Sequence, residues 1–134
     1  MAIKDMSDIE CVLPGSAACP GCPATMGLRT VFKALGKNTV MVVPACCTSV
    51  IESLYPNSSF AIPVMNIAFE AAAAGASGVE AGLRMQGKKD TTVVAWAGDG
   101  GTYDIGIQAL SGAIERQTNF IYFCYNNLVF LKFL

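Results

Sequence analysis

Histidine is absent from the 134 residues of the chain, and charged residues make up only 14% of them. Without histidine, the chain cannot contain a Ser-His or Cys-His nucleophilic pair, or a metal site with histidine ligands. The formal net charge is −1, so there is no basic excess of the kind that binds nucleic acid. These absences exclude several common enzyme classes and leave chemistry that an added cofactor supplies.

Long uninterrupted apolar segments are also missing. The longest apolar region, residues 62–83, contains Asn66, Glu70 and Glu80, and therefore cannot span a bilayer. Charged residues interrupt the first ten positions, so no signal peptide is visible. Hydrophobic residues nevertheless make up 53% of the chain, which suits a one-domain subunit that buries surface against partners. We expect a soluble, cytoplasmic chain with no membrane or nucleic-acid partner.

Two apolar runs towards the C-terminus predict neighbouring strands. Residues 91–97 are β-branched and apolar and too few for a helix, and residues 120–125 form a second such run. A helical pattern from Tyr103 to Ile114 separates them. Strand, helix and strand in about 35 residues predict a βαβ unit with parallel strands. We expect the second strand to lie in the interior of the sheet.

Polar and glycine residues follow both of these strands. The first run ends at Gly-Asp-Gly-Gly (residues 98–101), and the second ends at Asn126 and Asn127. Parallel strands end at one edge of the sheet, so Asp99 and Asn127 are expected near each other at the ligand-binding edge. Glycines and a helix start admit phosphate, and the oxygen side chains suit Mg²⁺. The sequence therefore predicts a diphosphate held through Mg²⁺.

This pattern resembles the thiamine-diphosphate signature, with an ordinary strand-to-helix turn as the alternative. The longer string from Ala97 to Ala113 is similar to the β subunit of 2-oxoacid:ferredoxin oxidoreductases, the pyruvate enzyme above all. The resemblance implies an α/β fold that binds thiamine diphosphate, with a mainly parallel sheet flanked by helices. That domain is expected over residues 18–134, after an N-terminal arm over residues 1–17.

The resemblance also implies roles for individual residues. Asp99 and Asn127 would bind Mg²⁺, with the carbonyl of Val129 as a third protein ligand. The cofactor itself is the nucleophile in such enzymes, so no side chain of this chain is expected to be catalytic. The activating glutamate lies on the α subunit, and we therefore expect this chain to be inactive alone. Three glycines would cradle the diphosphate: Gly98, Gly100 and Gly101.

Six cysteines in a chain of this kind indicate metal or redox chemistry before disulfides. Cys19 and Cys22 form a CxxC pair, which can place two thiolates on one metal or cluster. In the resembling family, such a pair and a third cysteine about 25 positions later ligate a [4Fe–4S] cluster. Cys47 lies 25 positions after Cys22, so it is the match. A buried thiol pair and a zinc site are the alternatives. Cys11 and Cys124 are expected to be packing residues or incidental thiols, and Cys46 occupies a place where many members of the resembling family carry glycine.

As the resemblance implies, the full enzyme converts pyruvate, coenzyme A and oxidised ferredoxin to acetyl-CoA, CO₂ and reduced ferredoxin, or runs in reverse. Its partners would be the α subunit, other subunits and ferredoxin. Branched-chain and indolepyruvate enzymes share the motifs, so the 2-oxoacid stays open. A decarboxylase-type thiamine enzyme would leave the cysteines unexplained. A non-catalytic zinc or redox module would leave residues 98–127 unexplained.

The resemblance fails after Asn127. Family members usually continue with an acidic residue, an aromatic residue and Asn-Thr-Gly, whereas this chain has Phe130 and then Lys-Phe-Leu at residues 132–134. Relatives also bring a fourth cluster cysteine from a later part, and three thiolates would leave a labile cluster. We expect a truncated or frame-shifted reading frame giving an inactive fragment, with a natural split subunit as the alternative.

The rest of the chain carries weaker signals. Pro23 is suited to the first position of a helix that Gly36 stops, and residues 39–45 form the first expected core strand. Residues 49–63 are expected to be irregular, and residues 66–86 to form a helix. Small residues recur along that helix and are expected to make a tight helix–helix contact: Ala71, Gly75, Gly78 and Gly82.

Overall fold

A computed structural model describes residues 8–53 and 56–127, which form an α/β unit around one parallel sheet. Its four strands lie in the order β2-β1-β3-β4, and every neighbouring pair is parallel. This architecture confirms the predicted α/β fold with a parallel sheet between helices. The strands are β1 (Thr39–Pro44), β2 (Val64–Ile67), β3 (Thr92–Gly98) and β4 (Ile121–Tyr125).

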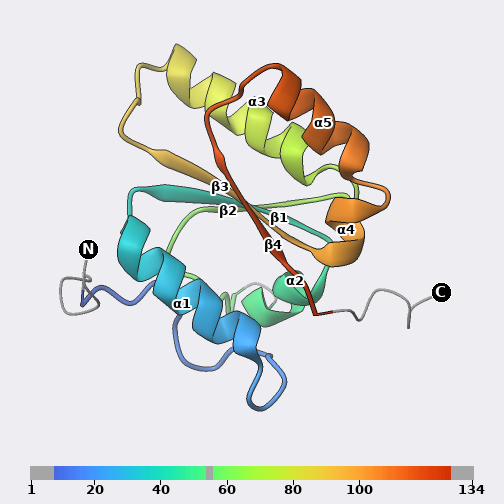
Figure 1. Ribbon diagram of the computed structural model, residues 1–134. Coiled ribbons are helices and arrows are strands. Elements are labelled where there is room, and N and C mark those ends of the chain that lie inside the picture. Colours follow the sequence, from blue (N-terminus) through green and yellow to red (C-terminus); the bar gives the residue numbers. More distant parts are fainter. Residues whose placement is uncertain (1–7, 54–55, 128–134) are drawn as a thin grey trace.

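Helices cover both faces of the sheet (Figure 1). Two of them, α3 (Ala72–Met85) and α5 (Ile107–Glu115), pack side by side on one face. The helices α1 (Pro23–Leu35) and α2 (Cys47–Glu52) lie on the other. A short helix, α4 (Asp99–Tyr103), follows β3 directly and leads into α5. Helix α1 thus begins and ends where Pro23 and Gly36 predict.

The side chains of β1 alternate between the two faces of the sheet and so hold the helices on both faces. Met41 and Val43 are buried in one cluster with Leu28 of α1, whereas Val42 is buried in another with Ala76 of α3. Successive side chains of a strand point to opposite faces, so β1 contributes to both cores. A strand buried on both faces reads as a continuous apolar run, which is why the sequence predicts β1 and β3 well.

The expectation that residues 120–125 lie in the interior of the sheet is wrong for the part of the chain that the structure describes. There, β4 pairs with β3 alone and forms an edge of the sheet. Cys124 is half-buried on this edge strand. An apolar run reports burial of the strand's two faces, not the number of its hydrogen-bonded neighbours. The sequence pattern therefore could not place β4 within the order of strands.

Three other boundaries differ from prediction. The segment predicted as one helix over residues 66–86 begins inside strand β2, which pairs with β1. Helix α3 starts only at Ala72. The region expected to be irregular from Ser49 lies partly in α2. The helix expected from Tyr103 starts only at Ile107 as α5, because a turn at residues 104–106 separates it from the short helix α4, which ends at Tyr103. Short apolar segments leave strand and helix ambiguous, and this ambiguity explains the misplaced start of α3.

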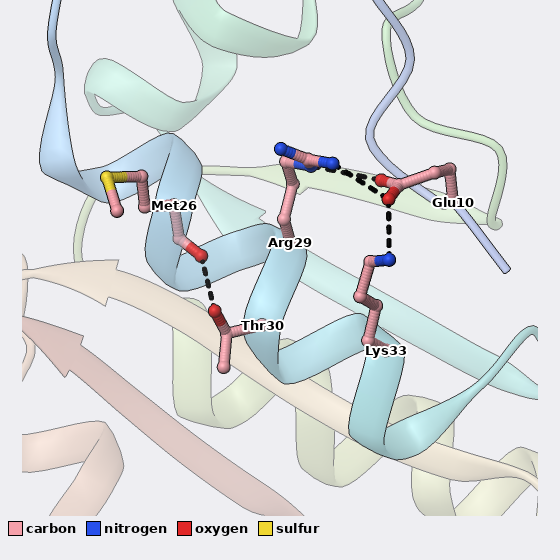
Figure 2. Close-up of polar contacts among 5 residues, drawn as sticks. All are labelled: Glu10, Met26, Arg29, Thr30 and Lys33. Atoms are coloured by element: carbon pink, nitrogen blue, oxygen red, sulfur yellow. Dashed lines mark hydrogen bonds and ion pairs between the residues drawn. The ribbon is translucent and has the colours of Figure 1, made fainter. Parts of the chain in front are cut away.

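The described residues of the predicted arm pack against the domain. Cys11 is 2% exposed, in agreement with a packing role, and Val12 makes an antiparallel bridge to Phe60. Beside them, the Glu10 carboxylate forms ion pairs of 2.8 Å with both Arg29 and Lys33 of α1 (Figure 2). These contacts fasten residues 10–12 to the α1 side of the sheet. No helix within the described ranges has the length and apolar character needed to cross a membrane.

Candidate functional site

The carboxyl ends of β3 and β4 lie side by side. The strand register pairs Gly98 of β3 with Tyr125 of β4. Asp99 follows Gly98 directly, and Asn127 follows Tyr125 by two residues. This is the arrangement that parallel pairing predicts for the two segments. Asp99 is half-buried as the first residue of α4, and Asn127 is exposed. Val129, the third expected ligand, lies outside the described residues.

The turn after β3 is packed too closely for larger residues. A Cβ atom at Gly98 would lie 3.3 Å from the Tyr125 hydroxyl oxygen, and one at Gly101 would lie 3.2 Å from the Phe69 carbonyl oxygen. Both glycines are buried, as is Gly100 between them. Glycine therefore relieves crowding against Tyr125 and Phe69 at two of the three positions that are predicted to cradle the diphosphate.

Gly106 explains why α4 is short. A Cβ atom at this position would collide with the carbonyl oxygen of Gly101, so the chain can fold back over α4 only with glycine there. The amide of Asp104 donates to the Gly100 carbonyl at 3.2 Å as the helix ends. A five-residue helix has few aligned peptide dipoles, so an anion at this edge would depend more on a metal ion than on the helix.

Thr102 is a site residue that the sequence interpretation missed. Its side chain is 2% exposed, and its hydroxyl lies 2.6 Å from the Gly98 carbonyl oxygen and 3.2 Å from the Tyr122 hydroxyl. Burial raises the pKa of Tyr122. The signal in the sequence was a hydroxyl residue four positions after the end of a buried strand, a spacing at which it can bond back to the chain.

Tyr125 connects the turn after β3 to the segment that carries Cys46 and Cys47. Its ring stacks on Trp96, with centroids 6.2 Å apart and planes 26° apart. Burial raises the pKa of Tyr125, and the neighbouring Cys46 thiol reinforces the shift. The Tyr125 hydroxyl thus lies near Gly98, and Tyr125 and Cys46 pack against the same core cluster, so the cysteine pair at the start of α2 lies near the Gly-Asp-Gly turn.

The structure forms the CxxC turn but does not gather a single-ion site. The amide of Cys22 donates to the Cys19 carbonyl at 3.0 Å, directly before α1. Cys19 and Cys47 are exposed and Cys22 is half-buried, and all are free thiols. Across residues 8–53 and 56–127, no three metal-binding side chains lie close enough to hold one ion. A groove of about 520 Å³ runs past the CxxC turn, between it and residues 10–16.

Comparison with known proteins agrees with this arrangement. The family described as "Thiamine pyrophosphate enzyme, C-terminal TPP binding domain" matches residues 45–131, which include the Gly-Asp-Gly turn and Asn127. Pyruvate synthase subunit PorB of Methanothermobacter thermautotrophicus is 53% identical over 123 residues, covering 92% of this chain and 43% of the relative.

Ketoisovalerate oxidoreductase subunit VorB of Pyrococcus furiosus is 45% identical over 123 residues, covering 88% of this chain and 40% of that relative. PorB of Methanocaldococcus jannaschii is 42% identical over 139 residues, covering 98% of this chain and 47% of the relative. The chain thus spans less than half the length of each of these relatives. With the family match and the paired carboxyl edge taken together, the chain belongs to the thiamine pyrophosphate enzymes, in the part that binds the cofactor.

Proposed function

We propose that this chain supplies the thiamine-diphosphate-binding part of the β subunit of a 2-oxoacid:ferredoxin oxidoreductase, with pyruvate as the 2-oxoacid. The observation that carries the proposal is the register of β3 and β4. It sets the Gly98-Asp99 turn beside Asn127 within the segment that matches the family. The 53% identity to a pyruvate synthase subunit supports the choice of substrate.

The residues at this edge fit thiamine diphosphate and Mg²⁺. Asp99 and Asn127 offer the hard oxygen atoms that Mg²⁺ prefers, and the carbonyl of Val129 would be a third protein ligand. Three buried glycines in this turn would let the backbone approach the diphosphate closely: Gly98, Gly100 and Gly101. When bound, thiamine diphosphate supplies the nucleophilic carbon and the electron sink of the reaction. Asp99 and Asn127 then hold and orient the cofactor.

We further propose that Cys19, Cys22 and Cys47 hold a [4Fe–4S] cluster, whose fourth ligand comes from outside the described residues. The preformed CxxC turn and the free, exposed thiol of Cys47 support this set. A four-iron cluster binds each thiolate on a different iron, so its ligands need not converge on one point. The proximity of Tyr125 to both Gly98 and Cys46 supports a position for the third ligand near the proposed cofactor edge. The cluster would carry electrons away singly, towards ferredoxin.

The complete enzyme would be cytoplasmic and would need partners. Its α subunit would provide the glutamate that activates the cofactor, and coenzyme A would accept the acyl group. The similarity to a ketoisovalerate oxidoreductase subunit favours a second candidate, the branched-chain 2-oxoacid enzyme. Turnover of pyruvate, 2-ketoisovalerate and indolepyruvate by the assembled complex distinguishes the candidates. Equal rates with all three would contradict the assignment to pyruvate.

The decisive test of cofactor binding is Asp99→Ala in the assembled enzyme. Removing the anionic ligand should weaken Mg²⁺-dependent binding of thiamine diphosphate by more than about 100-fold, since even residues that only support metal ligands change affinity by about 10- to 100-fold. Calorimetry measures the change. Asp104→Asn is the matched control, because Asp104 is exposed in the turn after α4 and should leave binding unchanged. Unchanged affinity in Asp99→Ala would overturn the proposal.

The cluster is tested by comparing two adjacent cysteines. After anaerobic purification of the assembled enzyme, Cys47→Ser should lose most of the iron and sulfide of this site, whereas Cys46→Ser should retain them. The two thiols share one turn and one neighbour, Tyr125, so the pair controls for local disturbance. Equal losses at both positions, or zinc in place of iron by elemental analysis, would contradict the assignment.

A further inference from the structure

We propose that Thr102 and Tyr122 are positioning residues that orient the peptide carrying Asp99. The proposal rests on the proposed function, because Asp99 matters there as a ligand of Mg²⁺. The carbonyl oxygen of Gly98 belongs to the same planar peptide unit as the nitrogen of Asp99. Thr102 contacts that oxygen at 2.6 Å, and its hydroxyl contacts Tyr122 at 3.2 Å. Two hydrogen bonds therefore connect strand β4 to the peptide that precedes the ligand.

The direction of both hydrogen bonds follows from the groups involved. A carbonyl oxygen can only accept, so the single hydroxyl proton of Thr102 is donated to Gly98. The oxygen of Thr102 then has lone pairs but no proton left for Tyr122. Tyr122 must therefore donate its hydroxyl proton to the Thr102 oxygen. The relay thus runs from Tyr122 through Thr102 to the Gly98 carbonyl.

Burial makes this relay hard to replace. Thr102 is 2% exposed, so water cannot reach the Gly98 carbonyl through its position. Removing the hydroxyl would leave a buried carbonyl without this donor, and such a loss costs more than the bond itself contributes. Tyr122 lies on β4, the strand that leads to Asn127, and pairs there with Ala95 of β3. One path of bonds therefore fixes Asp99 relative to the strand that carries the other proposed ligand.

The chain contains a matched control for the relay. Thr30 in α1 donates its hydroxyl to the Met26 carbonyl at 2.9 Å, the same spacing of four residues (Figure 2). That bond is exposed on a helix surface, away from the turn after β3. A change from threonine to valine removes one hydroxyl and keeps the shape of the side chain at both positions. Differences between the two variants therefore report on the relay and not on the loss of a helical hydroxyl.

The experiment uses the assembled enzyme and calorimetry with thiamine diphosphate and Mg²⁺. Thr102→Val should weaken Mg²⁺-dependent binding about 10-fold, and Tyr122→Phe about threefold, because each removes part of the bonding to the Gly98 carbonyl. Thr102→Ser keeps the hydroxyl and should restore binding to near the wild-type value. Thr30→Val should leave binding unchanged. In an Asp99→Ala background, Thr102→Val should cause no further loss.

A second readout needs no cofactor. Hydrogen exchange in the ligand-free enzyme should be faster over residues 98–103 in Thr102→Val than in wild type, and unchanged there in Thr30→Val. If Thr102→Val lowers the melting temperature but leaves Mg²⁺-dependent affinity unchanged, the residue is structural only and the proposal is overturned. If Thr102→Val fails to fold, Tyr122→Phe decides, and unchanged affinity there overturns it. Wild-type enzyme that binds no thiamine diphosphate would refute the proposed function, and unchanged exchange would separately refute the relay.

Discussion

Two segments of the molecule contain several glycines but use them differently. In the turn after β3, Gly98, Gly101 and Gly106 each lie against another part of the chain, and a Cβ atom would crowd or collide with it. In α3, by contrast, Gly78 and Gly82 have no atom within 4 Å of the position that a Cβ would take. The first segment needs glycine for packing at the candidate site. The second merely tolerates it over most of its length.

Within the part of the chain that the structure describes, the glycines of α3 do not form the expected tight helix–helix contact, and such a contact across subunits stays a prediction. Gly75 faces the sheet, where its Cβ would lie 2.6 Å from the Cδ1 atom of Ile67. The contact between α3 and α5 is built instead by small alanine side chains in one buried cluster: Ala73, Ala109 and Ala113. Helical spacing shows that residues share a face but does not show what that face meets.

The largest effect is expected at Gly106. A methyl group there would strike the backbone carbonyl of Gly101, and backbone cannot rotate away as a side chain can. Gly106→Ala should therefore lower the free energy of unfolding by about 3 kcal/mol, at the upper end of the range for overpacking. It should also weaken thiamine diphosphate binding, because α4 would have to move. Denaturant unfolding measures the change in stability. A loss of unfolding free energy below about 0.5 kcal/mol would show that the turn after β3 does not need glycine more than α3 does.

Within α3, two glycines should respond in opposite directions. Gly75→Ala must displace the end of the Ile67 side chain and crowd Val42, so it should destabilise the fold by about 1–2 kcal/mol. Gly78→Ala fills open space in the middle of the helix and should stabilise it by about 0.5–1 kcal/mol. Thermal unfolding of the two variants compares them directly. The same sign at both positions would show that packing does not separate them.

The smallest effect concerns the exposed ion pairs that hold residue 10 to α1. Arg29 and then Lys33 lower the pKa of Glu10 to about 2 from its ordinary value of 4.5. The stabilisation is therefore fully present above pH 4.5 and is lost as the pH falls through about 2. Wild type should lose slightly more stability than Glu10→Gln over that interval, and the difference should shrink in high salt. Identical acid profiles at low salt would exclude a contribution from these pairs.

Several elements were accessible from sequence because their signals are local and strong. The apolar runs of β1 and β3, the Pro23 start of α1 and the polar residues at the carboxyl edge all had such signals. The start of β2 was not recognised, because its apolar residues continue into those of α3 without a break that sequence alone reveals. Thr102 was missed for a different reason. Its importance depends on meeting Tyr122, and only the register of β3 and β4 determines that contact.

The order of strands also bears on how the molecule folds. β1 lies between β2 and β3 in the described sheet, and the neighbouring Thr91 hydroxyl donates to the Asn38 side chain across 53 positions of sequence. Closing a loop of that length costs chain entropy before any contact of the pair repays it, and such non-local pairing slows folding. The edge where Asp99 lies is complete only after this closure. Competence to bind the cofactor should therefore return late during refolding, after the local helices have formed.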